Sequence, residues 1–197
     1  MKKLLLIMGD LAAGKSTFAH VLSERYGTIV FCKDSIREVL GETIGFTNME
    51  ENIKLSKASI GLMSYIFSGF AKYGKDIILE SNFHVAELDL LHKTAEENGY
   101  EVLSLVLRGD ADNLHKRYVN RMENENRHPV HLGTTLHVLD DFRKYTEYSH
   151  GQAIPGKVVY IDANDFSYQT DAEILKCIDE FVEKRVADIL DINNAKH

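Results

Sequence analysis

The 197-residue sequence has no tryptophan, two prolines and two cysteines. It also lacks any apolar run of the roughly 18 residues that a membrane span needs. Two cysteines are too few for a disulfide framework, and Cys32 and Cys177 are too isolated for a zinc site, so both are expected to be buried free thiols. The 44% hydrophobic and 27% charged residues are typical of a globular protein and exclude a disordered or collagen-like chain.

Positive charge is also scarce. The chain has 23 Lys and Arg against 30 Asp and Glu, a net charge of −7. This balance argues against a permanent electrostatic attachment to nucleic acid or to an anionic membrane, although a local basic groove is still compatible with it.

The N-terminus begins like a secretory signal, with Lys2 and Lys3 before an apolar run. The run covers only residues 4–8, and Gly9-Asp10 follows it without a cleavage-site pattern. We therefore expect a soluble, cytoplasmic protein. The length and the absence of internal repeats favour a single domain over residues 1–197, with a small lid at about residues 110–135.

Short apolar segments alternate with segments of helical periodicity along the chain. The apolar segments are rich in Leu, Ile and Val, as strands buried on both faces are, and they cover residues 3–8, 28–32, 76–80, 101–107 and 157–162. The helical patterns cover residues 15–26, 34–40, 50–73, 85–98, 110–124, 134–149 and 171–190. This alternation predicts an α/β fold, in which helices cover both faces of a parallel sheet.

A phosphate-binding motif, G-x-x-x-x-G-K-[ST], lies between the first predicted strand and the first predicted helix. A chance match in a chain of this length has a probability of about one per cent. Its glycines let backbone N–H groups converge on phosphate oxygens at the positive end of a helix dipole. We expect Lys15 to reach the β- and γ-phosphates and Ser16 to ligate Mg²⁺. The predicted nucleotide-binding residues are Gly9, Asp10, Leu11, Ala12, Ala13, Gly14, Lys15, Ser16 and Thr17.

The second predicted strand leads to Asp34, with Arg37 three residues later on the same face of a helix. A carboxylate at the carboxyl end of a strand beside the phosphate-binding loop is suited to accept a proton from an attacking hydroxyl. Asp34 is equally suited to cap a helix N-terminus, with Arg37 as a surface charge, and the two roles are compatible.

The third predicted strand ends in Glu80, followed by Ser81 and Asn82. An apolar strand that ends in an acid is the pattern of a residue that holds the water shell of a metal ion, and Glu80 is also an alternative base to Asp34. Asn82 would point into the same crevice and orient a substrate hydroxyl or phosphate, unless it is an ordinary turn residue.

Three arginines follow the fourth predicted strand. Arg117 and Arg121 share a helix face, and Arg127 lies in the polar segment over residues 122–133. Guanidinium groups on a closing segment stabilise the charge of phosphoryl transfer, whereas the alternative for each is a solvated surface position. Histidines 128, 131 and 137 lack helical spacing and a nearby cysteine, which argues against a zinc site. The turn at residues 162–165 lies where an adenine could rest.

Taken in this order, these motifs resemble the small P-loop kinases, a group that contains zeta-toxin-like kinases, chloramphenicol phosphotransferase and the kinase domain of polynucleotide kinase. The resemblance covers residues 3 to about 165. It implies a P-loop NTPase fold with five parallel strands in the order two-three-one-four-five, and ATP and Mg²⁺ as cosubstrates. It further implies Asp34 as the general base, Arg37 as a substrate contact and Arg121 as the lid arginine at the transferring phosphate. Polynucleotide kinases tend to have an Asp-Asn-Thr type tip where this chain has Glu80-Ser81-Asn82-Phe83, which favours the small-molecule or toxin-like branches.

The favoured hypothesis is an ATP-dependent phosphotransferase that acts on a hydroxyl of a small molecule or nucleotide-type acceptor. The sequence lacks the N-K-x-D and D-x-x-G motifs of GTPases. The alternatives are a 5′-hydroxyl polynucleotide kinase and a non-catalytic ATP-binding module. The predicted roles are catalysis for Asp34, Lys15 and Arg121, nucleotide binding for the loop and Arg117, substrate binding for Arg37, Asn82 and Arg127, and metal binding for Ser16 and Glu80. No motif encodes the acceptor, because its pocket is shaped by the loop at residues 41–49, the helix at 50–73 and the lid.

Overall fold

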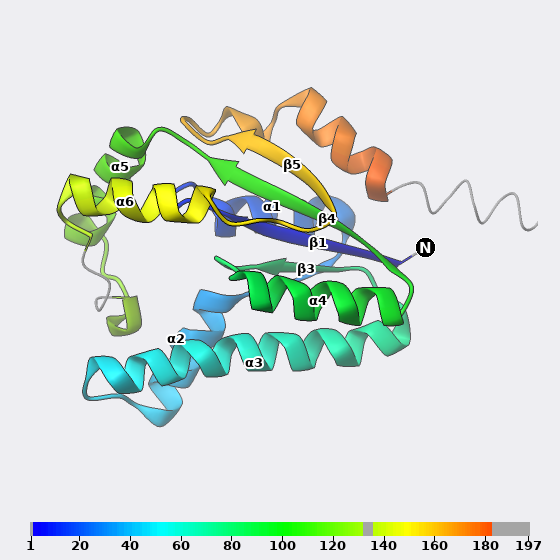
Figure 1. Cartoon of the computed structure of the whole chain (residues 1–197), viewed down its shortest axis with the longest axis horizontal. Coiled ribbons are helices and arrows are strands. Elements are labelled where there is room, and N and C mark those ends of the chain that lie inside the picture. The colour runs from blue at the N-terminus through cyan, green and yellow to red at the C-terminus, as the bar shows by residue number, and fades with distance from the viewer. Residues whose placement is uncertain (1, 132–135, 183–197) are drawn as a thin grey trace, which may run out of the picture.

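The computed structural model describes residues 2–131 and 136–182. A five-stranded parallel sheet forms its centre, with strands in the order β2-β3-β1-β4-β5 (Figure 1), and this order is the predicted one. The predicted strands are confirmed with ends that differ by one residue at most: β1 (Lys2–Gly9), β2 (Ile29–Cys32), β3 (Ile77–Glu80), β4 (Tyr100–Arg108) and β5 (Lys157–Asp162).

The helices lie between these strands in the sequence. They are α1 (Lys15–Tyr26), α2 (Lys33–Ile44), α3 (Met49–Tyr73), α4 (Val85–Glu97), α5 (Ala111–Asn124) and α6 (Leu139–His150), with short 3₁₀ turns η1 (Pro129–His131) and η2 (Ser167–Gln169). Residues 172–182 form a further helix, and the rest of the segment predicted over 171–190 lies outside the described residues. Among the described residues, no helix combines the length and the apolar character of a membrane span.

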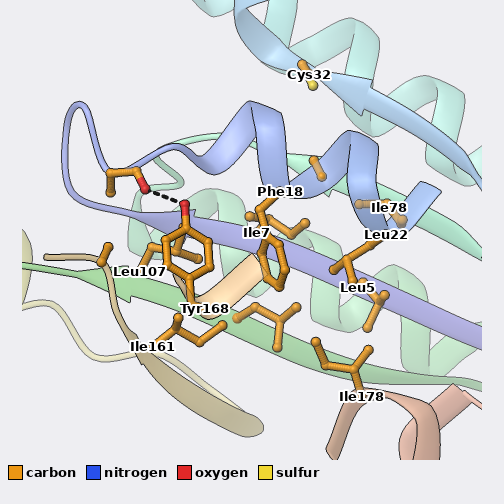
Figure 2. Close-up of a cluster of buried hydrophobic side chains, with 14 of the residues drawn as sticks. Leu5, Ile7, Phe18, Leu22, Cys32, Ile78, Leu107, Ile161, Tyr168 and Ile178 are labelled. Atoms are coloured by element: carbon orange, nitrogen blue, oxygen red, sulfur yellow. Dashed lines mark hydrogen bonds between the residues drawn. The ribbon is translucent and has the colours of Figure 1, made fainter. Parts of the chain in front are cut away.

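The sheet is buried on both faces because alternate side chains of β1 enter different clusters. Leu5 and Ile7 pack with Phe18 of α1 and with Ile178 of the last described helix (Figure 2). Leu4, Leu6 and Met8 lie on the opposite face, where they pack with side chains of α3 and α4. Continuous apolar runs are therefore required in the central strands, as the sequence indicated.

Helix α3, which was expected to help shape the acceptor pocket, contributes mainly to the core. Its buried side chains are Asn52, Leu55, Ser59, Met63, Phe67 and Ala71, so most of its apolar side is core. Only its first turns, at Met49, Ile53, Ser56 and Lys57, reach the large cleft described below.

Two predicted boundaries were wrong. Helix α2 continues through Gly41 to Ile44 instead of ending at residue 40. At Gly41 the helix packs closely against η1. A Cβ at this position would lie 2.5 Å from Cγ1 of Val130, so a larger residue would force η1 away from the helix. Helix α6 begins at Leu139, not at residue 134, and residue 134 itself lies outside the described residues.

The segment before α6 is held against α5 instead of joining the helix. The amide of Leu136 donates to the Tyr118 hydroxyl at 3.4 Å, and Nε2 of His115 lies 3.0 Å from the carbonyl oxygen of His137. The expectation that both cysteines are buried was also wrong for one of them, because Cys32 is buried and Cys177 is exposed.

The carboxyl ends of the parallel strands meet at one edge of the sheet. Helices α5 and α6 lie beyond this edge (Figure 1), and so does the loop that connects β1 to α1. The topology therefore brings together at this edge motifs that lie far apart in the sequence, from the loop after β1 to the turn after β5.

Candidate active site

The loop from Gly9 to Gly14 has the backbone of a phosphate cradle. Gly9 and Gly14 have φ angles of 122° and 85°, and Ala12 adopts the left-handed region at 59°. Gly14 is the N-cap of α1, and no described side chain caps that helix. The first amides of α1 are therefore available to an anion.

The Lys15 side chain bends back onto its own loop. Its Nζ donates to the Asp10 carbonyl oxygen at 2.6 Å. Burial lowers the pKa of Lys15, while the nearby Glu80 and Asp34 carboxylates act in the opposite direction. A bound triphosphate would favour the charged amine in the same way as these carboxylates, and so strengthen its own binding.

Glu80 lies at the tip of β3, at 5% exposure. Its Oε2 accepts a hydrogen bond from Ser16 Oγ at 3.1 Å, and the buried thiol of Cys32 also bonds to it. Burial raises the pKa of Glu80, and the positive charge of Lys15 partly offsets this. One hydroxyl and one carboxylate beside a phosphate site fit the oxygen ligands and water-rich coordination that Mg²⁺ prefers.

Asp34 lies in the first turn of α2, with its side chain 55% exposed. Cys32, not Asp34, occupies the N-cap position, so the alternative prediction of Asp34 as a helix cap does not apply. Arg37, one turn further, donates from Nη2 to Oδ1 of Asn52 at 2.7 Å. Its Nε is buried without a hydrogen-bond partner among the described residues.

Near β5 the site presents a guanidinium group and an exposed aromatic ring. The Arg117 guanidinium donates to the carbonyl oxygens of Ala163, at 2.8 Å, and Asn164. It lies over the ring of Phe166, with Cζ 4.6 Å from the ring centroid. Phe166 also approaches Gly14 so closely that a Cβ there would lie 2.9 Å from Cε1 of the ring. An exposed aromatic ring and a guanidinium beside the phosphate loop suit a nucleotide base.

One cleft of about 920 Å³ connects these parts. The predicted residues that line it are Leu11, Ala12, Gly14, Lys15, Ser16, Thr17, Asp34, Arg37, Glu80, Asn82, Arg117, Arg121 and Arg127. Burial lowers the pKa of Arg127, and the positive charge of the nearby Arg121 lowers it further. Basic side chains from the loop and from α5 thus face one space, in a protein whose net charge is −7.

Three residues of the predicted loop, Gly9, Asp10 and Ala13, do not line the cleft. The Asp10 carboxylate points the other way, where it accepts from the Gly109 amide at 3.0 Å and lies 2.9 Å from Nε2 of His150. Its side chain therefore ties the loop to β4 and α6, and a nucleotide-binding role for it stays a prediction.

Tyr145 and Phe166 are among the cleft side chains that sequence reasoning missed. Tyr145 of α6 lies within hydrogen-bonding reach of Asn82, and burial raises the pKa of its hydroxyl. Phe166 directly follows the turn at residues 162–165, where an adenine was expected to rest, so its position in the sequence could have identified it. Tyr145 carried no comparable signal, because an aromatic residue on an amphipathic helix is usually core.

The comparisons with known proteins bear on the fold and the family. A candidate kinase from Chloroflexus aurantiacus has a similar structure, with a TM-score of 0.76 and 20% identity over 93% of this chain and 97% of its own. A gluconokinase from Sinorhizobium meliloti has a TM-score of 0.59 and 14% identity, over 95% and 97% of the two chains. The APS kinase CysC of Mycobacterium tuberculosis, solved with AMPPNP and APS, has a TM-score of 0.55 and 13% identity, over 90% and 98%.

At these identities the solved structures establish the fold, which is that of the P-loop kinases, and this confirms the resemblance seen in the sequence. No curated protein matches the sequence. A family model described as an AAA domain matches residues 4–147 and so includes the phosphate-binding loop, Asp34, Glu80 and the arginines of α5. The chain therefore belongs to this AAA-domain family of P-loop proteins.

Proposed function

We propose that the protein is an ATP-dependent kinase that transfers the γ-phosphoryl group to a hydroxyl of a small acceptor molecule. The observation that carries this proposal is that the phosphate-binding loop, the Ser16–Glu80 pair and the Asp34 carboxylate all line one cleft. The relatives of similar structure support the reaction class, since they include a gluconokinase and an APS kinase.

In the proposed reaction, Asp34 accepts the proton of the acceptor hydroxyl. The acceptor oxygen forms a bond to the γ-phosphorus, the bond from that phosphorus to the β,γ-bridging oxygen breaks, and ADP leaves with its electron pair. Lys15, Arg121 and Arg127 stabilise the negative charge spread over the transferring group. Arg37 and Asn82 hold the acceptor.

Asp34 suits the role of base better than Glu80 does. Asp34 is exposed to the cleft, whereas Glu80 is buried and already bonded to Ser16 and Cys32. Ser16 and Glu80 would hold Mg²⁺, which supplies charge neutralisation at the phosphates when it is bound. Arg117 and Phe166 would bind the base of the nucleotide.

The test is a screen for ADP release from MgATP, with sugar acids, polyols, nucleosides and a 5′-hydroxyl oligonucleotide offered as acceptors. We expect one acceptor class to stimulate ADP release in the wild type, and phosphorus NMR to detect its phosphate ester. Asp34→Asn is expected to lower that turnover by roughly 10²- to 10⁴-fold, the usual contribution of a general base.

Lys15→Met serves as the control that loses nucleotide binding, and Asp34→Asn should still bind MgATP. The proposal is contradicted if no acceptor raises ADP release above the rate with water. Full turnover in Asp34→Asn would remove that residue from the mechanism.

A further inference from the structure

His131 is a buried histidine that the proposed reaction does not yet use. It ends η1, in the segment between α5 and α6, and its side chain is 6% exposed. Its Nε2 lies 2.6 Å from Oε1 of Glu38, and its Nδ1 lies 3.9 Å from Oδ2 of Asp34. Asp34 and Glu38 are four residues apart on α2, so they share a face and the imidazole ring lies against both.

The two ring nitrogens of His131 have different partners, and these partners indicate the role of each nitrogen in the neutral ring. A carboxylate only accepts hydrogen bonds, so the short contact to Glu38 requires the proton on Nε2. In the neutral ring, Nδ1 is then the unprotonated nitrogen, and it faces Asp34. The ring is thus oriented to take a proton from Asp34 and to give one to Glu38.

Packing holds His131 in this position. The preceding residue, Val130, is 1% exposed, and its carbonyl oxygen accepts from Nδ2 of Asn52 at 2.9 Å. Val130 also fills the space above Gly41 on α2. The other charged groups near the ring are Arg127, on the same segment, and His128, whose Nε2 lies 3.9 Å from Oε1 of Glu42. The Asp34 and Glu38 carboxylates both act to raise the pKa of Arg127, against the effect of its burial.

We propose that His131 is a positioning residue that orients Asp34 and carries the acceptor's proton from Asp34 to Glu38. This inference rests on the proposed kinase function. The exposed Asp34 side chain, whose Oδ2 lies 3.9 Å from Nδ1 of His131, first approaches to hydrogen-bonding distance. The protonated Asp34 carboxyl then gives its proton to Nδ1, and the proton on Nε2 passes to the Glu38 carboxylate. Glu38 is 42% exposed and does not line the cleft, so it can release the proton to bulk water. To restore its starting tautomer, the ring loses the Nδ1 proton to water in the cleft, which His131 lines, and Nε2 takes up one proton from water through Glu38. The net result is the release of one proton to water, and Asp34 is ionised for the next cycle.

The first test measures the tautomer and requires no acceptor. A long-range ¹H–¹⁵N correlation spectrum of the ¹⁵N-labelled protein, compared with that of His131→Gln to assign the signals, distinguishes the two ring nitrogens. We expect the neutral His131 ring to carry its proton on Nε2. A ring protonated on Nδ1 would be unable to accept from Asp34 and would overturn the proposal.

The second test measures turnover. His131→Gln keeps an N–H donor for Glu38 but cannot relay a proton. It should lower kcat for ADP release from MgATP by roughly tenfold to a hundredfold, the lower part of the range for acid–base groups, with KM for MgATP unchanged. The acceptor is the one found by the screen. His128→Gln, on the same segment, is the matched control and should keep the wild-type kcat.

Chemical rescue by imidazole distinguishes a proton relay by His131 from a purely structural role of this residue. Millimolar imidazole should restore part of the turnover of His131→Ala if the ring carries a proton, and should have no effect on His128→Ala. Wild-type kcat in His131→Gln, while Asp34→Asn is inactive, would overturn the relay and leave the proposed function intact. Full turnover in Asp34→Asn would instead overturn the proposed function itself.

Discussion

The proposed function assigns one side of the cleft to the nucleotide and the other to the acceptor, and the two sides are built in different ways. The nucleotide side is one continuous stretch, from the end of β1 through the loop to the first turn of α1, and its conformation is set by glycines with positive φ angles. The acceptor side is assembled from α2, α3 and η1, which meet through the side chain of Asn52 between Arg37 and Val130. The nucleotide side therefore depends on backbone geometry, whereas the acceptor side depends on tertiary hydrogen bonds.

The largest expected effect concerns the backbone of the nucleotide side. In Gly9→Ala, the new Cβ would overlap the carbonyl oxygen of Leu107 at a φ of 122°, so β1 and β4 would have to separate. We expect the free energy of unfolding to fall by more than about 3 kcal/mol, as for other strained or overpacked core positions. Urea denaturation measures this.

Gly61→Ala is the matched control for that substitution. Gly61 lies inside α3, and apart from the neighbouring backbone of that helix no heavy atom of the described residues lies within 4 Å of the position of its Cβ. Alanine should stabilise the helix there by up to about 1 kcal/mol. Equal unfolding midpoints for Gly9→Ala and the wild type would show that the loop does not depend on this close approach.

An intermediate effect is expected on the acceptor side. Asn52 is 2% exposed and holds Arg37 and Val130 together, so Asn52→Ala leaves buried polar groups without partners. The free energy of unfolding should fall by about 2 kcal/mol. The affinity for MgATP should stay at the wild-type value, because α2 and η1 are not part of the nucleotide side.

Ser59→Ala provides the comparison on the same helix. Ser59 is fully buried, and among the residues that the structure describes its hydroxyl bonds only to the carbonyl oxygen of Leu55 in its own helix. Its loss should change stability by less than about 0.5 kcal/mol. A fall in MgATP affinity in Asn52→Ala, but not in Ser59→Ala, would contradict the separation of the two sides.

The smallest effect is expected at the base of the nucleotide. Phe166→Ala removes the ring under Arg117, and exposed contacts of this kind contribute about 1 kcal/mol, so MgATP binding should weaken roughly fivefold. Inorganic triphosphate should bind with unchanged affinity, and Phe166→Tyr should resemble the wild type in both titrations. If Phe166→Ala weakened the binding of MgATP and of inorganic triphosphate equally, Phe166 would contact the phosphates and not the base.

The difference between the two sides also explains what the sequence could predict. The strand order followed from the resemblance, and the residues of the phosphate-binding loop were readable because their spacing is local. Glu80 and Asp34 were readable because each follows a strand that ends at the same edge of the sheet. The partners of Asp34 and Arg37 could not be predicted from the sequence. His131 approaches Asp34 and Asn52 bonds to Arg37 from other segments, and nothing in their local pattern distinguishes them from core or surface residues.

The length of α2 and the start of α6 were missed for a related reason. A glycine and a polar segment normally predict a helix end, but Gly41 remains helical because Val130 packs against it. Residues 134–138 contain no glycine or proline that would end a helix, but backbone groups of Leu136 and His137 bond to Tyr118 and His115 of α5. Tertiary contacts decided both boundaries.

The most direct test of the account is the binding of MgAMP-PNP to Lys15→Met and Asp34→Asn, measured by isothermal titration calorimetry. The account predicts that Lys15→Met binds at least roughly tenfold more weakly than the wild type, because a charge-assisted hydrogen bond to phosphate is lost. Asp34→Asn should bind within roughly threefold of the wild type while losing phosphoryl transfer. Equal losses of binding in the two variants, or a loss in Asp34→Asn alone, would contradict the division of the cleft into a nucleotide side and an acceptor side.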